Sequence, residues 1–264
     1  VTTIITGNCG GSEITIGSYA NRLTGLGINV ATFIGHNTVR MEVMGPEDRE
    51  PTNAEMDRMK SLVDKAMQDG AVGFSTGLLY VPGTYAETSE VIELAKIAAE
   101  YGGVYTTHIR EQGAKLHESL IEAITIGVEA DMPVQISHHK AAGRDNWGTT
   151  LKTLPLIEAA NQKKHRVRVD VYPYHAGSAG MAQLVPPWAH EGGRGAMLTR
   201  LKDPVQRRRI ARDMVRGTDN WPNFFKLEWD DIQIATVGTP ANRKWIGKRI
   251  ADVARSRKLS LIHI

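Results

Sequence analysis

The stretch from Val104 to Lys140 reads VYTTHIREQGAKLHESLIEAITIGVEADMPVQISHHK. A β-branched run opens it, an amphipathic helical pattern follows, and a second β-branched run closes it after Pro133. The helical pattern has apolar residues spaced three and four apart: Leu116, Leu120, Ile121, Ile124 and Val128. This order is typical of a βα unit in a parallel sheet.

The same alternation continues on both sides of this unit. Six runs are predicted as strands: Thr2–Thr6, Val30–Ile34, Ala71–Ser75, Val104–Thr107, Pro133–Ile136 and Val167–Tyr172. Three further helices are predicted: one from a capping box at Thr52 and Glu55 to a stop at Gly70, one over Val91–Ala99, and one over about Leu151–Gln162. Near-continuous apolar strands fit a sheet that is covered on both faces.

Length and composition are those of a soluble α/β enzyme. The 264 residues suffice for one barrel, which takes about 250. The chain is 41% hydrophobic and 23% charged, and no apolar run approaches the roughly 20 residues that cross a bilayer. The single cysteine excludes an internal disulfide, which fits a reducing compartment, so a cytoplasmic location is expected.

The net charge of +3 comes mainly from the C-terminal third, for example Arg207–Arg209. No aromatic residues interleave these basic ones as a stacking platform for nucleic acid would require. We therefore expect a solvated basic face, a small-molecule partner, and neither a nucleic-acid nor a membrane partner.

The ends of the chain and the region after Tyr174 depart from the alternation. Val1 lies inside a predicted strand without an initiator methionine, and Lys258–Ile264 follow a helical pattern directly. These features predict an internal fragment of a longer protein. After Tyr174 the strand-helix rhythm stops, which predicts an inserted cap or small subdomain.

Three predicted strands end in residues that bind metals. Cys9 lies in the glycine-rich turn Gly7–Ser12 after the first strand, and His108 and His138 end two later strands. Side chains at the carboxyl ends of parallel barrel strands face the active site. A thiolate and two neutral imidazoles are a ligand set that zinc accepts, so these residues form a candidate zinc site if the strands converge.

Other strand-end residues have simpler explanations. Ser75 ends a predicted strand, and its hydroxyl is expected to bond loop backbone instead of acting as a nucleophile. His36 also ends a strand and could line the site, although a supporting or structural role is favoured.

Taken together, the motifs resemble those of the N-acyl-D-amino-acid deacylases (D-aminoacylases) of the amidohydrolase superfamily. The shared motifs are Gly-Asn-Cys-Gly at 7–10, Gly-Phe-Ser-Thr-Gly-Leu at 73–78, Thr-His-Ile-Arg at 107–110, Ser-His-His-Lys at 137–140, Asn-Trp-Gly at 146–148 and Tyr-Pro-Tyr-His-Ala-Gly-Ser at 172–178. The resemblance covers nearly the whole chain, and the cysteine motif is its most specific part.

The resemblance implies a distorted (β/α)8 TIM-like barrel of the metal-dependent hydrolase type, incomplete at both ends, with an inserted cap. Residues 1–178 would be barrel strands two to seven with their helices, and 179–264 the cap and the lead-in to the last strand. The implied metal ligands are Cys9, His108 and His138 for one or two zinc ions, with His139 directed away. Lys140, Tyr172 and Ser178 would bind substrate.

Two parts of the family's site would lie outside the chain. A His-x-His pair would precede Val1, and the general-base aspartate would follow Ile264, so no catalytic base is assigned within the chain. The implied reaction is zinc-dependent hydrolysis of a linear amide C–N bond, which releases a carboxylate and a D-amino acid. The alternatives are a cyclic-amide hydrolase, such as a hydantoinase or dihydroorotase, and a non-catalytic metal-binding barrel.

Overall fold

The computed structural model describes residues 1–218, 221 and 228–259. Within them, every strand pairs in parallel with its neighbours, and the strands form two sheets, ordered β1-β2 and β3-β4-β5-β6-β7. Their bounds are Thr3–Thr6 (β1), Asn29–Thr32 (β2), Ile34–Gly35 (β3), Gly73–Gly77 (β4), Val104–His108 (β5), Val134–Ile136 (β6) and Val167–Val169 (β7). The α/β fold is confirmed and is compatible with part of a (β/α)8 barrel.

The predicted strand at Val30–Ile34 is divided in two. Phe33 separates β2, which pairs with β1, from β3, which pairs with β4. Because a single residue lies between them, β2 and β3 connect the two sheets. Ala71–Ser75 is also shifted, because the strand there begins at Gly73 and extends to Gly77.

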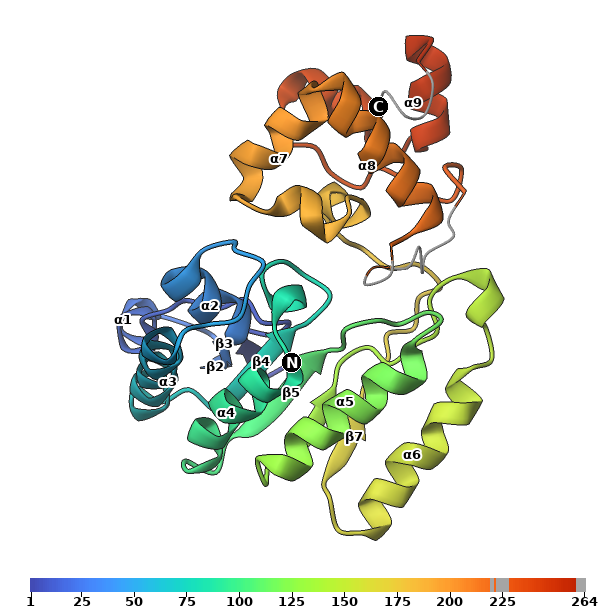
Figure 1. Ribbon diagram of the computed structural model, residues 1–264. Helices are drawn as coiled ribbons and strands as arrows, with labels where there is room; N and C mark the ends of the chain where they lie inside the picture. Colours follow the sequence, from blue (N-terminus) through green and yellow to red (C-terminus); the bar gives the residue numbers. More distant parts are fainter. Residues whose placement is uncertain (219–220, 222–227, 260–264) are drawn as a thin grey trace.

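Four long helices pack side by side against one face of the larger sheet, following the order of the strands (Figure 1). They are α3 (Asn53–Gln68), α4 (Thr88–Ala99), α5 (Leu116–Glu129) and α6 (Thr150–Gln162). All four predicted helices are confirmed, as is the capping box of Thr52 and Glu55. In residues 1–178 the structure adds two helices that were not predicted, α1 (Ile16–Arg22) and α2 (His36–Met44), which are short and carry no capping side chain.

The core lies between this helical layer and the sheet. Phe74 and Tyr105 are paired across β4 and β5, and both are fully buried with stacked rings. Leu94 from α4 and Leu120 from α5 are equally buried in the same cluster. Each such side chain stabilises the fold by about 1.5 to 3 kcal/mol, so this layer holds the strand ends in place.

Two edge strands differ from the sequence-based expectation. Apolar character predicted strands covered on both faces, but three of the four residues in β1 are exposed. The last strand ends at Val169 instead of Tyr172, and Val171 is 72% exposed. Burial therefore follows the position of a strand in the sheet as well as its composition.

Beyond residue 180 the described chain is mainly helical and forms a second lobe (Figure 1). Its helices are α7 (Gly193–Lys202), α8 (Pro204–Arg216) and α9 (Ile250–Arg257). Single-turn and short 3-10 helices are η1 (Gly83–Tyr85), η2 (Arg144–Asn146), η3 (Met181–Leu184), η4 (Pro187–His190) and η5 (Pro240–Trp245). The division into a barrel part and a cap stays a prediction, and residues 260–264 of the final predicted segment lie outside the described residues.

None of the helices in the described ranges combines the length and the apolar character that a bilayer crossing requires.

Candidate metal centre

Cys9, His108 and His138 meet where three parallel strands end. Cys9 follows β1, His108 is the last residue of β5, and His138 follows β6 by two residues. His108 Nδ1 lies 2.8 Å from His138 Nε2, which lies 3.9 Å from Cys9 Sγ. One ligand atom from each residue lies within 4.8 Å of the others. The predicted convergence of the three side chains is confirmed, while their role as ligands stays a prediction.

Two of the three residues have a left-handed backbone conformation. The φ angle is 56° at Cys9 and 42° at His138, a region that residues with side chains seldom adopt. At His138 this turn is stabilised by Asp170, whose Oδ1 accepts the His138 backbone N–H at 2.6 Å. Backbone strain of this kind is concentrated at functional sites, where the turn redirects a side chain.

The turn that carries Cys9 packs directly on β4. Ser75 Oγ donates to the Gly7 carbonyl at 2.5 Å and accepts the Gly10 N–H at 3.2 Å. Gly10 has φ of 78°, and a Cβ there would approach Asn37 Oδ1 to 1.9 Å, so only glycine fits. The expectation that Ser75 bonds loop backbone is confirmed.

Electrostatics favour neutral imidazoles in the cluster. Burial lowers the pKa of His108 well below its ordinary value, and the nearby His138 and Lys140 lower it further. Burial and the charge of Lys140 also lower the pKa of His138. Each ring therefore offers an unprotonated nitrogen at neutral pH. Burial and Asp170 raise the pKa of the Cys9 thiol, although Lys140 opposes them, so a cation is needed to favour the thiolate.

The donor atoms fit a zinc ion. Zinc takes nitrogen at about 2.0 to 2.1 Å and sulfur at about 2.3 Å, so tetrahedral ligands are about 3.3 to 3.6 Å apart. The Cys9 to His138 distance of 3.9 Å is close to this value, whereas the two rings at 2.8 Å would have to separate slightly. Two nitrogens and a sulfur are also the ligand chemistry that zinc prefers.

The three predicted substrate residues differ in how close they lie to the cluster. Lys140 Nζ donates to the His138 carbonyl at 3.2 Å and lies 5.2 Å from the ring centre of Tyr172. The Tyr172 ring in turn lies 6.3 Å from that of His138. Ser178 is exposed, and in the described part of the chain no polar contact joins it to the cluster. Two of the three residues thus border the cluster.

Lys140 is partly desolvated at this position. Burial lowers its pKa to about 8, against the opposing effects of Cys9 and Asp170. The amine therefore remains mostly protonated at neutral pH and can attract an anion.

Tyr80 and Gln112 also contact the cluster but were not predicted. Tyr80 Oη lies 3.3 Å from His108 Nδ1, and the two ring centres are 4.7 Å apart. Gln112 Nε2 lies 3.0 Å from His138 Nδ1. Both residues follow a strand end by three or four positions, and this placement is the only sequence signal that could have indicated them.

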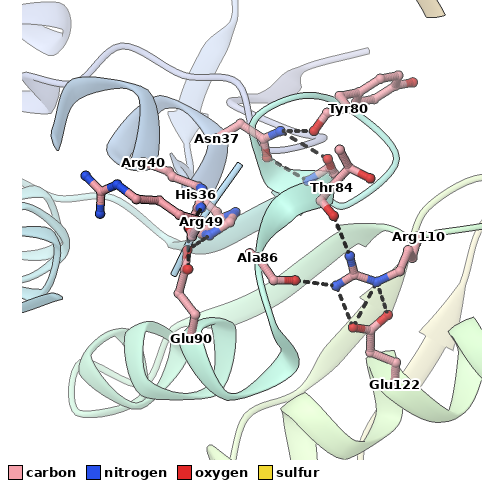
Figure 2. Close-up of polar contacts among 11 residues, drawn as sticks. His36, Asn37, Arg40, Arg49, Tyr80, Thr84, Ala86, Glu90, Arg110 and Glu122 are labelled. Carbon is pink, nitrogen blue, oxygen red and sulfur yellow. Dashed lines mark hydrogen bonds and ion pairs between the residues drawn. The ribbon is translucent and has the colours of Figure 1, made fainter. Parts of the chain in front are cut away.

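The loop that carries Tyr80 is anchored on two sides (Figure 2). Asn37 Nδ2 donates to the carbonyls of Gly77 at 3.0 Å and of Tyr80 at 3.1 Å. Arg110 donates to the carbonyls of Thr84 and Ala86 at 3.0 and 2.9 Å. Arg110 also forms an ion pair with Glu122 at 2.8 Å. These contacts fix the phenol beside His108.

His36 and His139 lie outside the cluster. His36 is fully buried, and its Nε2 lies 2.8 Å from Glu90 Oε1, which agrees with the structural role favoured from the sequence. His139 Nε2 lies 2.9 Å from Thr153 Oγ1, so its ring is directed away from the cluster as the resemblance implied.

The chain is similar to D-aminoacylases both in sequence and in structure. No family model matches the chain. The D-aminoacylase of Alcaligenes xylosoxydans xylosoxydans is 40% identical over 208 residues, which are 69% of this chain and 43% of that protein. The chain thus spans less than half the length of this curated relative.

Solved structures agree with this relationship. A crystal structure of a D-aminoacylase, described as defining a novel subset of amidohydrolases, matches 99% of this chain and 52% of its own, with 30% identity and a TM-score of 0.72. The N-acyl-D-glutamate deacylase of Bordetella bronchiseptica, complexed with zinc and a phosphonate inhibitor, covers the same shares with 27% identity and a TM-score of 0.75. A further D-aminoacylase structure concerns a binuclear metal centre. A site for one or two zinc ions fits these neighbours.

Proposed function

Because this chain is homologous to the N-acyl-D-amino-acid deacylases of the amidohydrolase superfamily, we propose that the intact protein hydrolyses the amide bond of N-acyl-D-amino acids with zinc. The observation that carries the proposal is the meeting of Cys9, His108 and His138 within 4.8 Å at the strand ends. The products are a carboxylate and a D-amino acid.

In this proposal Cys9 Sγ, His108 Nδ1 and His138 Nε2 hold the metal. Bound there, zinc supplies polarisation of the substrate carbonyl and a lowered pKa for water. The low pKa values of both histidines keep their nitrogens free of protons, so the rings can bind the metal at neutral pH. The proton-transferring aspartate that the family resemblance implies is not assigned to any residue of this chain.

Lys140, Tyr172 and Ser178 are proposed to bind the substrate. The Lys140 ammonium attracts the free carboxylate as a point charge, since it remains mostly protonated at neutral pH. Tyr172 is near both Lys140 and the exposed segment that contains Ser178: Lys140 Nζ lies 5.2 Å from its ring centre, and a Cβ on Gly177 would lie 3.4 Å from its Oη. Their hydrogen bonds would orient the scissile amide over the cluster.

Residues 1–178 are proposed as the barrel part and 179–264 as a cap over its mouth. We further propose a cytoplasmic location and a small-molecule partner only, without nucleic acid or membrane. Support comes from Cys9, because a cysteine that binds metal must stay reduced. Arginines of α8 also have partners within the lobe, as Arg209 stacks 3.9 Å over Trp188.

The test is a substrate panel with the intact, zinc-loaded protein. N-acetyl-D-amino acids should be hydrolysed, whereas their L-enantiomers and a hydantoin should react at background rates. Turnover of the hydantoin in preference to the linear amides would replace this proposal with a cyclic-amide hydrolase. Bound zinc without turnover of any substrate would instead indicate a non-catalytic barrel.

A further inference from the structure

His138 has a contact at each ring nitrogen. On one side, Nε2 lies 2.8 Å from His108 Nδ1 and 3.9 Å from Cys9 Sγ. On the other side, Nδ1 faces the amide of Gln112 at 3.0 Å. The Gln112 side chain belongs to a residue that is only 6% exposed, so water does not replace this contact freely.

The contact at Nδ1 matters because a neutral imidazole carries a single proton. The nitrogen that binds a metal must present its lone pair, and the proton is then on the other nitrogen. Ligation through Nε2 therefore places the proton of His138 on Nδ1. This N–H needs an acceptor, and the side chain that faces it is the amide of Gln112.

A glutamine amide can supply either a donor or an acceptor at nearly the same point. A half turn about the Cγ–Cδ bond exchanges Nε2 and Oε1 without moving the rest of the side chain. We infer that Gln112 is a positioning residue for the metal: its Oε1 accepts the Nδ1–H of His138, which fixes the tautomer with a lone pair on Nε2. The inference rests on the zinc site of the proposed function.

The segment around Gln112 is well held. The Gln112 carbonyl accepts the Ala142 N–H at 2.7 Å, which ties the loop after β5 to the loop after β6. The neighbouring Glu111 N–H donates to Ser119 Oγ at 3.0 Å, and the Glu111 carboxylate accepts the Gly113 and Lys115 N–H groups. Gln112 is therefore presented to His138 from a rigid turn.

His108 lacks an equivalent contact. Its Nε2 is buried and has no hydrogen-bond partner in the described part of the chain. Among the two histidines, only His138 thus has its tautomer selected by a side-chain amide. This asymmetry makes Gln112 the residue whose replacement should change metal affinity without removing a ligand.

The experiment compares zinc affinity in the intact protein and in the variants Gln112→Met and Gln112→Glu, by competition with a chelator. Methionine has similar length but no amide, so zinc should bind about 10- to 100-fold more weakly, as outer-shell replacements typically cause. Glutamate can accept but, when ionised, cannot donate, so its variant should bind zinc at least as tightly as the native protein. Gln68→Met, on the exposed end of α3, is the matched control and should leave affinity unchanged.

The possible outcomes distinguish a wrong metal site from a wrong role for Gln112. If the native protein binds no zinc, the proposed metal site is wrong and this inference falls with it. If the native protein and both Gln112 variants bind equally, the site stands and only the inference is wrong. Equal weakening by methionine and glutamate would show that the amide donates, contrary to the orientation inferred.

A second measurement does not depend on the folding of a variant. Long-range ¹H–¹⁵N NMR of the native, zinc-loaded protein reports which nitrogen of His138 carries the proton. The inference requires the proton on Nδ1, and a proton on Nε2 would overturn it.

Discussion

Two clusters at strand ends contain histidines, and the side chains that surround these histidines differ in chemistry. In the first, His36 contacts Glu90 Oε1 at 2.8 Å, Arg40 donates to the same carboxylate, and Arg40 also donates to the Arg49 carbonyl at 2.5 Å (Figure 2). The second joins His108, His138 and Cys9, whose facing atoms are two nitrogens and a sulfur. The first cluster pairs opposite charges, whereas the second brings together electron-pair donors.

The difference separates a structural role from a ligand role. A buried carboxylate with a guanidinium and an imidazole is electrically compensated, so the fold itself accounts for it. Lone-pair donors that face one another attract a cation, and a fold gains little by assembling them without one. Burial of a histidine therefore does not by itself indicate function; the chemistry of its neighbours does.

The largest expected effect lies in the first cluster. Glu90→Ala leaves the buried Arg40 charge without its carboxylate, which should lower the free energy of unfolding by about 3 to 5 kcal/mol. Glu93→Ala on the same helix is the control, because its ion pairs with Lys60 and Lys96 are exposed and worth about 1 kcal/mol or less. Urea denaturation measures both, and equal losses would contradict the structural role.

Next in size is the loss of a ligand in the second cluster. Cys9→Ser exchanges sulfur for oxygen with little change in shape, so zinc affinity should fall by at least about 100-fold, more than an outer-shell change produces, while metal-free stability stays near native. His36→Gln should do the reverse, lowering stability and leaving zinc affinity intact. Zinc titration and thermal melting of the two variants provide the test. If both variants lost zinc affinity and stability to the same extent, the two clusters would not differ in role.

Replacing Lys140 should weaken the binding of substrate without changing the stability of the fold or the zinc content. Without the ammonium the substrate carboxylate loses a charged partner worth about 1.5 to 3 kcal/mol, so Lys140→Ala should lower kcat/KM about 10- to 100-fold. Zinc content and melting temperature should remain close to native, because the contacts of Lys140 within the described residues are limited to the His138 carbonyl and the Tyr172 ring. A matching loss of stability would favour a structural role.

The smallest effect concerns acid pH. Burial raises the pKa of the Glu90 carboxyl, but His36 and Arg40 outweigh burial and leave that pKa below its ordinary value. A lowered folded-state pKa contributes stability that is complete above the unfolded value of about 4.3 and is lost as pH falls through the folded value. Stability of the native protein should therefore fall more steeply than that of Glu90→Gln over this range, as urea midpoints at several pH values would reveal. Parallel curves would show that Glu90 is not the titrating group.

Much of the α/β part was predictable from local pattern. Apolar spacing indicated α3 to α6, and the capping box located the start of α3. Strand ends were less accurate, because pairing sets them: β2 stops at Thr32 where β1 stops, and β3 begins with a new partner, β4. The apolar pattern of Val30–Ile34 is continuous and does not indicate that the pairing partner changes within it.

For the candidate site, sequence alone identified the residue types and their positions after strands. It placed Cys9, His108 and His138 at strand ends because alternation of strands and helices is a local property, encoded within a few residues. It could not decide that His36, also at a strand end, lies against Glu90 on α4, or that Tyr80 and Gln112 reach the histidines.

Those decisions belong to the tertiary structure, for a physical reason. Cys9 and His138 are 129 positions apart, and their approach to 3.9 Å depends on the order of the strands and on the packing of every helix between them. Side-chain periodicity specifies which face of an element is apolar, but it carries no information about which distant element covers that face. The sequence therefore determined the ligand chemistry of the candidate site, and the packed sheet decided which of its histidines face one another.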